Sequence, residues 1–172
     1  MDAVVYQRCF SDKEFSSMLY ADDTVNMDYF LCDNPGKQRL IVSISIGDSR
    51  QKTVGFVQLQ DNGDNQQTII GGVFPEYFNK GIAVFCVVAV LSHIFAIAPE
   101  KIVTTGILLR NCRSLKMMTG VGFRRTSENS QRINLQLSYN DFADNDFVDR
   151  IKQKIDVVYD SGSSKGSEYM DA

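Results

Sequence analysis

The sequence predicts a mixed α/β fold built on one sheet. Stretches that alternate apolar and polar residues recur along the chain, which is typical of strands packed on one side. A long apolar stretch, Ile82 to Ile97, separates two groups of these strands and predicts a helical crossover between them. At 172 residues the chain has the length of one domain with a full core.

The composition is that of an ordinary globular protein, with 44% hydrophobic, 23% charged and 10% aromatic residues. It excludes a disordered chain, a collagen and a small disulfide-stapled protein. The longest apolar run, residues 82–98, is interrupted by Ser92 and His93 and is shorter than the roughly 20 residues of a membrane span. We therefore interpret it as a buried helix and expect no membrane partner.

Two features of the chain favour a cytoplasmic location. The N-terminus has no basic region followed by an apolar stretch, so we expect no secretory signal. The four cysteines are scattered without a close pair, which favours reduced thiols over a disulfide framework or a zinc site. These cysteines are Cys9, Cys32, Cys86 and Cys112.

The first part of the chain predicts one strand, one helix and a three-stranded meander. Residues 4–10 are β-rich, and Ser11 to Glu14 has the S-x-x-E form of a capping box, which predicts a helix to about Tyr20. Residues 21–39 are polar, with a turn expected at 33–36. The meander strands are predicted at 40–46, 53–59 and 68–74, with a hairpin turn at 61–65.

The second part predicts alternating helices and strands. The apolar helix 82–97 is followed by Pro99, which cannot continue it. A strand at 101–108, a helix at 111–119 capped by Asn111, a strand region from Phe123 and a strand at 132–139 follow. We expect residues 1–140 to form the main domain, 141–160 a helical extension and 161–172 a flexible tail.

Charge is unevenly distributed along the chain. Residues 78–132 hold eight basic and two acidic residues, a net charge of +6, although the whole chain carries −3. One basic segment between acidic ones suggests an anionic ligand, and a randomly clustered solvated face is the alternative. The segment is short and the pI is about 5.1, so we expect no nucleic-acid partner.

A small-residue turn joins the meander to the apolar helix. Phe78-Asn79-Lys80-Gly81-Ile82-Ala83 lets a phosphate approach the backbone, where the first N–H groups of a helix are unpaired and carry partial positive charge. Lys80 adds a cation. The turn lacks the spacing of a P-loop or of a G-x-G-x-x-G dinucleotide turn, and a purely structural tight turn is the alternative.

Three motifs together resemble the GCN5-related N-acetyltransferase (GNAT) superfamily. Within it, they are most similar to the ribosomal-protein N-terminal acetyltransferase branch. Gly71 to Ala83 resembles the fourth strand and pyrophosphate loop of that superfamily. A strand ending at Asn111 is followed by Asn111-Cys112-Arg113-Ser114 and then Gly122-Phe123, which resembles the N-x-x-S…G-F motif of the branch. The resemblance implies a mostly antiparallel twisted sheet of six to seven strands with helices on both faces.

The same resemblance implies acetyl-CoA as co-substrate and acetyl transfer to a primary amine of a small molecule or a protein. Asn111 would contact the cofactor, Gly72 and Val73 would pair with its pantetheine arm, and Arg113 would meet its phosphates. The backbone from Phe78 to Ala83 would hold its pyrophosphate through Phe78, Asn79, Lys80, Gly81, Ile82 and Ala83.

For catalysis, the resemblance places Ser114 near the thioester sulfur, as a group that would protonate the leaving thiolate. Glu76 is the acid nearest the strand 68–74 and the candidate base, with a solvated structural role as the alternative. Many members of the resembling family have a tyrosine that acts as the general acid, and this chain has Met118 at that position. Catalysis would therefore depend on Ser114 or water. The alternative function is a catalytically degenerate binding or structural module, and a homodimer is left open.

Other chemistry-bearing residues are interpreted as structural. His93 lies in the apolar helix, Cys86 packs as a small apolar residue, and Cys112 has no nearby histidine to activate it. Four aspartates after the first helix would favour a cationic acceptor in the resembling family, with a solvated loop as the alternative. They are Asp22, Asp23, Asp28 and Asp33.

Overall fold

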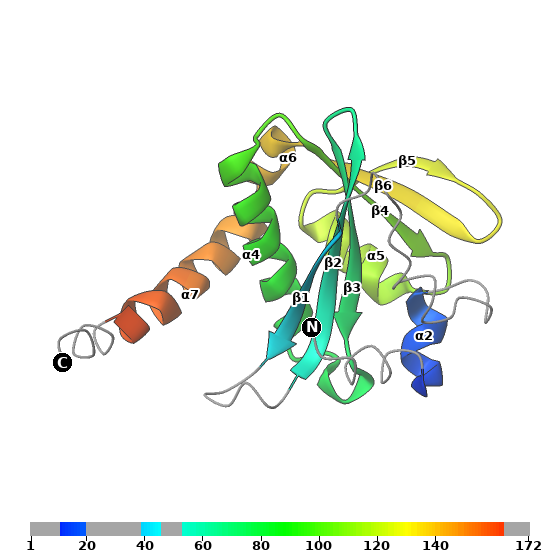
Figure 1. The fold of residues 1–172 in the computed structure, drawn as a ribbon, viewed down its shortest axis with the longest axis horizontal. Coiled ribbons are helices and arrows are strands. Elements are labelled where there is room, and N and C mark those ends of the chain that lie inside the picture. Colours follow the sequence, from blue (N-terminus) through cyan, green and yellow to red (C-terminus); the bar gives the residue numbers. More distant parts are fainter. Residues whose placement is uncertain (1–10, 20–38, 46–52, 164–172) are drawn as a thin grey trace.

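A computed structural model describes residues 11–19, 39–45 and 53–163 of the chain (Figure 1). The predicted strand at 4–10 and the four aspartates between Asp22 and Asp33 lie outside the described residues. Of the predicted tail 161–172, residues 161–163 belong to the last helix and the rest lie outside the described residues. The elements are α2 (Lys13–Leu19), β1 (Arg39–Ser45), β2 (Thr53–Gly63), β3 (Gln66–Val73), the 3-10 turn η1 (Pro75–Tyr77), α4 (Ile82–Ile97), β4 (Ile102–Leu108), α5 (Cys112–Gly120), β5 (Arg124–Glu128), β6 (Arg132–Leu137), α6 (Tyr139–Ala143) and α7 (Asp146–Ser163).

In the described part of the chain the strands form one six-stranded sheet with the order β1-β2-β3-β4-β6-β5. Neighbouring strands are antiparallel except for β3 and β4, which are parallel. The link between these two parallel strands is the apolar helix α4, as a parallel connection requires. The predicted mixed α/β fold and mostly antiparallel sheet are confirmed.

Helices cover both faces of the sheet. In Figure 1, α4 and α7 lie on one side of strands β1 to β3 and α2 on the other. Phe15 of α2 packs against the rings of Phe56 and Phe74, with ring centroids 6.0 and 5.3 Å apart. Alternate residues of β4 and β6, such as Val103 and Leu135, are buried in the same core. Burial on both faces explains why β2 is apolar with little alternation between Val54 and Leu59.

The apolar helix α4 begins and ends where the sequence predicts. It starts after Gly81, whose φ of +77° is the left-handed conformation that glycine adopts at little cost. It ends at Ile97, two residues before Pro99. Within the described residues no helix combines the length and the apolar character that crossing a membrane requires.

The N-cap of helix α2 lies one residue later than the capping-box motif predicts. The helix runs from Lys13 to Leu19, and the Asp12 carboxylate accepts the backbone N–H of Phe15 at 3.1 Å. Asp12 is thus the N-cap in place of Ser11, because either side chain can accept from the N–H three residues ahead.

The single helix expected after residue 140 is two helices. Tyr139–Ala143 forms α6, and a break at Asp144 and Asn145 precedes α7. Asn145 Oδ1 accepts the N–H groups of Phe147 at 2.9 Å and Val148 at 3.2 Å, so it caps the second helix. The apolar periodicity continues through the break because Phe142 and Val148 both enter the core, which is why the sequence pattern concealed it.

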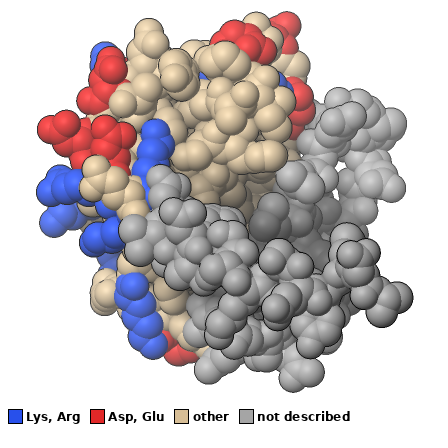
Figure 2. All heavy atoms as spheres, turned by 90° about the vertical axis from the view of Figure 1, so that its left-hand side faces the viewer, with Lys and Arg blue, Asp and Glu red and all other residues tan. Residues whose placement is uncertain are grey.

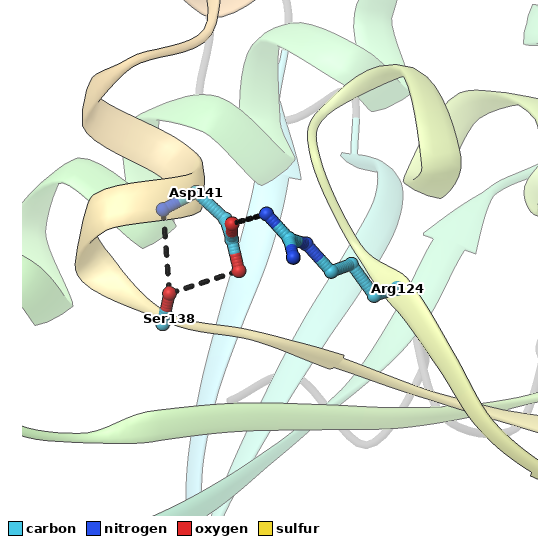
Figure 3. Close-up of polar contacts among 3 residues, drawn as sticks. All are labelled: Arg124, Ser138 and Asp141. Carbon is cyan, nitrogen blue, oxygen red and sulfur yellow. Dashed lines mark hydrogen bonds and ion pairs between the residues drawn. The ribbon is translucent and has the colours of Figure 1, made fainter.

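A capped turn joins α6 to the edge of the sheet (Figure 3). Ser138 accepts the N–H of Asp141 at 3.3 Å and donates its hydroxyl to the Asp141 carboxylate at 2.9 Å. The same carboxylate binds the guanidinium of Arg124 at the start of β5. The carbonyl of Asp141 also passes close to Gly122, where a Cβ would meet it at 2.7 Å. The glycine of the G-F pair is therefore required by packing.

We expect Ser138→Ala to lower the free energy of unfolding by about 0.5–2 kcal/mol, as is typical for loss of a helix N-cap. Chemical denaturation followed by circular dichroism measures it. Ser130→Ala, at an exposed position between β5 and β6, is the control and should change stability little. Equal stability of the two variants would contradict a capping role for Ser138.

Candidate functional site

The parallel strands β3 and β4 touch at one end and separate at the other. Their paired residues run from Gln66 and Ile102 to Thr68 and Thr104 and stop there. Both strands continue beyond this point, β3 to Val73 and β4 to Leu108. The backbone of β3 after Thr68 therefore has a described strand partner only on its β2 side. We call the space between these two strand ends the wedge.

The closed end of the wedge is held by polar contacts. The hydroxyls of Thr68 and Thr104 lie 2.9 Å apart across the two strands. Lys101, just before β4, donates to the Asp61 carboxylate at 2.9 Å, and Ile102 N–H donates to Asn65 O at 2.8 Å. The hydrogen bond from Lys101 is the main reason that the pKa of Asp61 is lowered. These bonds fix the apex from which the strands diverge.

The open end of the wedge leads to two helix N-termini. β3 continues through η1 into the turn before α4, and β4 continues into Asn111 and the start of α5. The guanidinium of Arg113 in the first turn of α5 lies 5.1 Å from the ring centroid of Phe78 in the turn before α4. The two motifs that the sequence separates by about thirty residues thus meet in space.

The turn before α4 presents backbone N–H groups. Phe78 N–H donates to Pro75 O at 3.0 Å, so it is already used, and the first helical bond of α4 is from Phe85 N–H to Gly81 O at 3.2 Å. Among the described residues, the backbone N–H groups from Asn79 to Ala83 have no hydrogen-bond partner. Asn79 and Gly81 both have positive φ, 60° and 77°. Such a turn at a helix start suits an anion.

The basic side chains of this region divide into two groups. Arg110 donates to the carbonyl of Ser17, so its charge holds the end of α2. Lys80, Arg113 and Lys116 are exposed. Lys80 and Arg113 also lie over the rings of Tyr77 and Phe78. Figure 2 shows that most Lys and Arg side chains of the face it views lie toward one border, with Asp and Glu side chains among them.

Asn111 caps α5 as predicted and also anchors α2. Its Oδ1 accepts the N–H of Ser114 at 3.2 Å, and its Nδ2 donates to Met18 O at 3.1 Å. Because Ser114 is held through its backbone, its half-buried hydroxyl is not needed to start the helix. Contact of Asn111 and Ser114 with a ligand stays a prediction.

The remaining predicted site residues lie along β3 and its turn. Gly72 leaves room for a side chain, since a Cβ would be 3.5 Å from the Phe15 ring, whereas a Cβ on Gly71 would meet Phe56 O at 2.2 Å. Gly71 is therefore a packing requirement between β2 and β3. Val73 is buried and Glu76 is exposed in η1.

Of the residues interpreted as structural, Met118 and Cys86 have the surroundings of core residues, whereas His93 and Cys112 are exposed. Met118 is 7% exposed and packs in the core. Burial raises the pKa of the Cys86 thiol, as expected for a small core residue. His93 is exposed on α4, and Cys112 is exposed at the start of α5. Among the described residues, no group of three or more His, Cys, Asp or Glu is arranged to hold a metal ion.

Sequence reasoning missed the contacts that assemble the site. The Arg113–Phe78 stack, the Thr68–Thr104 pair and the Asp61–Lys101 ion pair join residues that are far apart in the chain. The alternation of Thr68 and Thr104 with buried Ile69 and Val103 was visible, but it carries no register between strands.

No family model matches the sequence, and no curated protein matches it. Solved structures do. Spermidine N-acetyltransferase from Vibrio cholerae in complex with CoA and spermine is 12% identical, with a TM-score of 0.62 over 84% of this chain and 95% of that one. A domain from Methanocaldococcus jannaschii is 16% identical, with a TM-score of 0.62 over 80% and 95%.

Ribosomal-protein-S5-alanine acetyltransferase from Vibrio fischeri also matches, at 18% identity and a TM-score of 0.48, over 53% of this chain and 57% of that one. The chain therefore spans little more than half the length of that protein, and nothing in the match singles out the ribosomal-protein branch. At these identities, the matches to the spermidine enzyme and the archaeal domain show that the chain shares their fold.

The ion pair at the apex gives a pH-dependent prediction. Because the folded pKa of Asp61 is lowered from 3.8, its stabilisation is present above that value and is lost as the pH falls through the folded pKa. Lys101→Met should therefore reduce stability at pH 7, by less than about 1 kcal/mol, and the deficit should shrink toward pH 3. Lys154→Met is the control, and a deficit that stays constant with pH would contradict the assignment.

Proposed function

We propose that the chain is an acetyl-CoA-dependent N-acetyltransferase of the GNAT superfamily, transferring an acetyl group to a primary amine. The observation that carries the proposal is the wedge between β3 and β4, with the starts of α4 and α5 together at its open end. The shared fold with a spermidine N-acetyltransferase solved with CoA supports it.

The diphosphate of CoA would lie at the start of α4. The N–H groups from Asn79 to Ala83 can donate to phosphate oxygens, and the helix end adds partial positive charge. The exposed cations of Lys80 and Arg113 lie beside this turn, over the rings of Tyr77 and Phe78. This gives a use for the basic segment 78–132, whose net charge is +6.

The pantetheine arm of CoA would lie in the wedge. It carries amide groups, and the β3 backbone near Gly72 and Val73 has no described strand partner on the β4 side. A ligand amide can pair there as an additional strand would. The thioester would then lie between β3 and β4, near the start of α5.

The reaction needs few protein groups. A neutral amine attacks the thioester carbonyl carbon, the carbonyl oxygen gains negative charge, and the C–S bond then breaks to release the thiolate of CoA. The protein supplies proximity, an N–H to stabilise the oxygen, and proton transfer. We assign protonation of the thiolate to Ser114, which lies half-buried in the first turn of α5, and leave Glu76 as the candidate base that accepts the amine proton.

The acceptor class that we propose is a protein N-terminus, a lysine or a small cationic amine. The ribosomal-protein branch belongs to the same proposal, on the N-x-x-S…G-F resemblance at Asn111 to Phe123. We further propose a cytoplasmic protein, on its scattered cysteines, and leave a homodimer open.

A second candidate is a protein that binds CoA without turnover. Met118 occupies the position at which many members of the superfamily have a tyrosine as general acid. Its side chain is buried in the core and has no proton to donate. This candidate shares the CoA site and differs only in lacking transfer.

Gly81→Ala should weaken CoA binding. Both Gly81 and Gly63 have a φ near +77°, at 77° and 76°, and neither would bring a Cβ within 3.4 Å of another atom. Alanine at either position should therefore cost a similar 1–2 kcal/mol of stability. Only Gly81→Ala should lose the stabilisation by CoA, measured as a thermal shift at saturating ligand.

Gly63→Ala is thus the matched control for backbone strain. Wild-type protein that shows no thermal shift with millimolar CoA would overturn the proposed function. Equal CoA affinity in the two variants would move the diphosphate away from the start of α4.

Ser114→Ala should lower kcat for acetyl transfer on the order of 100-fold, as expected for loss of a general acid, and leave CoA affinity unchanged. The fold should be kept, because Asn111 caps α5 through the Ser114 backbone. Release of CoA measures kcat, and a kcat equal to that of the wild type would assign the proton to water.

A further inference from the structure

One buried side-chain carbonyl in the sheet has no hydrogen-bond partner among the described residues. Gln58, in the middle of β2, is 2% exposed, and within the described part of the chain its Oε1 has no hydrogen-bond partner. A buried carbonyl left without a partner lowers the stability of the folded state. Such groups are uncommon in native proteins and call for an explanation.

The neighbouring glutamine Gln60 has a hydrogen-bonded side-chain amide, unlike the unpartnered carbonyl of Gln58. Gln60 lies two residues further along β2 and so on the same face. Its Nε2 donates to Asn62 Oδ1 at 2.9 Å, and Asn62 Nδ2 donates to Thr68 Oγ1 at 2.7 Å. The amide of Gln60 is therefore used within the sheet, while the Oε1 of Gln58 is kept free at the cost of stability.

The register places Gln58 on the face that continues into the wedge. Gln58 is paired with Ile70 of β3, so the two side chains lie on one face, together with Thr68 and Gly72. Thr68 meets Thr104 of β4 at 2.9 Å, which extends this face across the apex of the wedge.

Exposure is uneven along this face. On β3 and β4, Thr68, Ile70, Gly72 and Thr104 are partly exposed, whereas on β2 Phe56 is buried against Phe15 of α2. A molecule in the wedge would therefore reach Gln58 from the β3 side of this face.

The chemistry of this face is neutral. From Phe56 to Gln60 on β2, Thr68 to Gly72 on β3 and Thr104 to Gly106 on β4, the residues of this face carry no carboxylate. An amide carbonyl accepts an N–H but stabilises an ammonium ion less than a carboxylate does. It can position an amine while leaving it easier to deprotonate, and a neutral amine is the form that attacks a thioester.

We propose that Gln58 binds the acceptor substrate, its Oε1 accepting a hydrogen bond from an N–H of the amine or of the amide next to it. The inference rests on the proposed acetyl transfer and adds the residue that selects the acceptor. Gln58 is a substrate-binding residue, separate from the CoA site at the start of α4.

The test replaces Gln58 with the apolar methionine of similar shape, Gln58→Met, and uses Gln60→Met as the matched control. The acceptor probes are spermidine, lysine amide and an alanine-initiated hexapeptide, each added to CoA-saturated protein. The side-chain amide signals of Gln58 are identified in a ¹⁵N–¹H spectrum as the pair absent from Gln58→Met. This readout needs no turnover.

The Gln58 signals should move with at least one probe. Gln58→Met should bind that probe on the order of tenfold more weakly, or raise its KM as much, with unchanged CoA affinity. Its melting temperature should equal or exceed that of the wild type, because an unpaired buried carbonyl is removed. Gln60→Met should lose stability and keep probe affinity, because its amide is used within the sheet.

Gln58 signals that move with none of the probes would overturn the inference, as would unchanged probe affinity in Gln58→Met. A Gln58→Met variant that is clearly less stable than the wild type would assign Gln58 a structural role instead. A failure of the proposed function is seen separately, as the lack of any CoA-induced thermal shift in the wild type.

Discussion

The rest of the structure depends on a parallel strand pair that is closed at one end only. β3 and β4 share three paired positions and then diverge, while β2 and β6 continue to hold their outer edges. The Thr68–Thr104 contact and the Asp61–Lys101 pair fix the closed end. Because the outer edges stay paired, the divergence opens a wedge inside the sheet instead of fraying its border.

Several polar residues near the open end serve the scaffold before they serve any ligand. Asn111 and Arg110 bind the last carbonyls of α2, which a helix end cannot satisfy within itself. Gly122 is imposed by the carbonyl of Asp141, and Gly71 by that of Phe56. In the N-x-x-S…G-F motif, Asn111 and Gly122 are thus needed to build the fold. The hydroxyl of Ser114 is not used to start the helix.

On the face of the sheet beside the wedge, one polar group is not used by the scaffold. The side chains of Gln60, Asn62 and Thr68 are joined by hydrogen bonds, but the carbonyl of Gln58 is buried without a partner among the described residues. Unpaired buried groups of this kind cluster where function outweighs stability. The CoA site at the start of α4 and the acceptor face near Gln58 would then meet at the wedge, from its open end and from its side.

Local pattern alone determined the order of the strands and α-helices from β1 to β6, both ends of α4 and the capping of α5 by Asn111, because helix starts, prolines and alternation act within a few residues. Local pattern also indicated the turn 78–83 as a candidate anion site, and the family resemblance indicated Asn111–Ser114 as a candidate part of the site. Local pattern did not reveal the break at Asn145, since both helices bury the same apolar stripe. Only the tertiary structure decided that β3 and β4 diverge, that Phe78 meets Arg113 and that Gln58 is left unpaired, because register and packing between distant segments are set by the whole core.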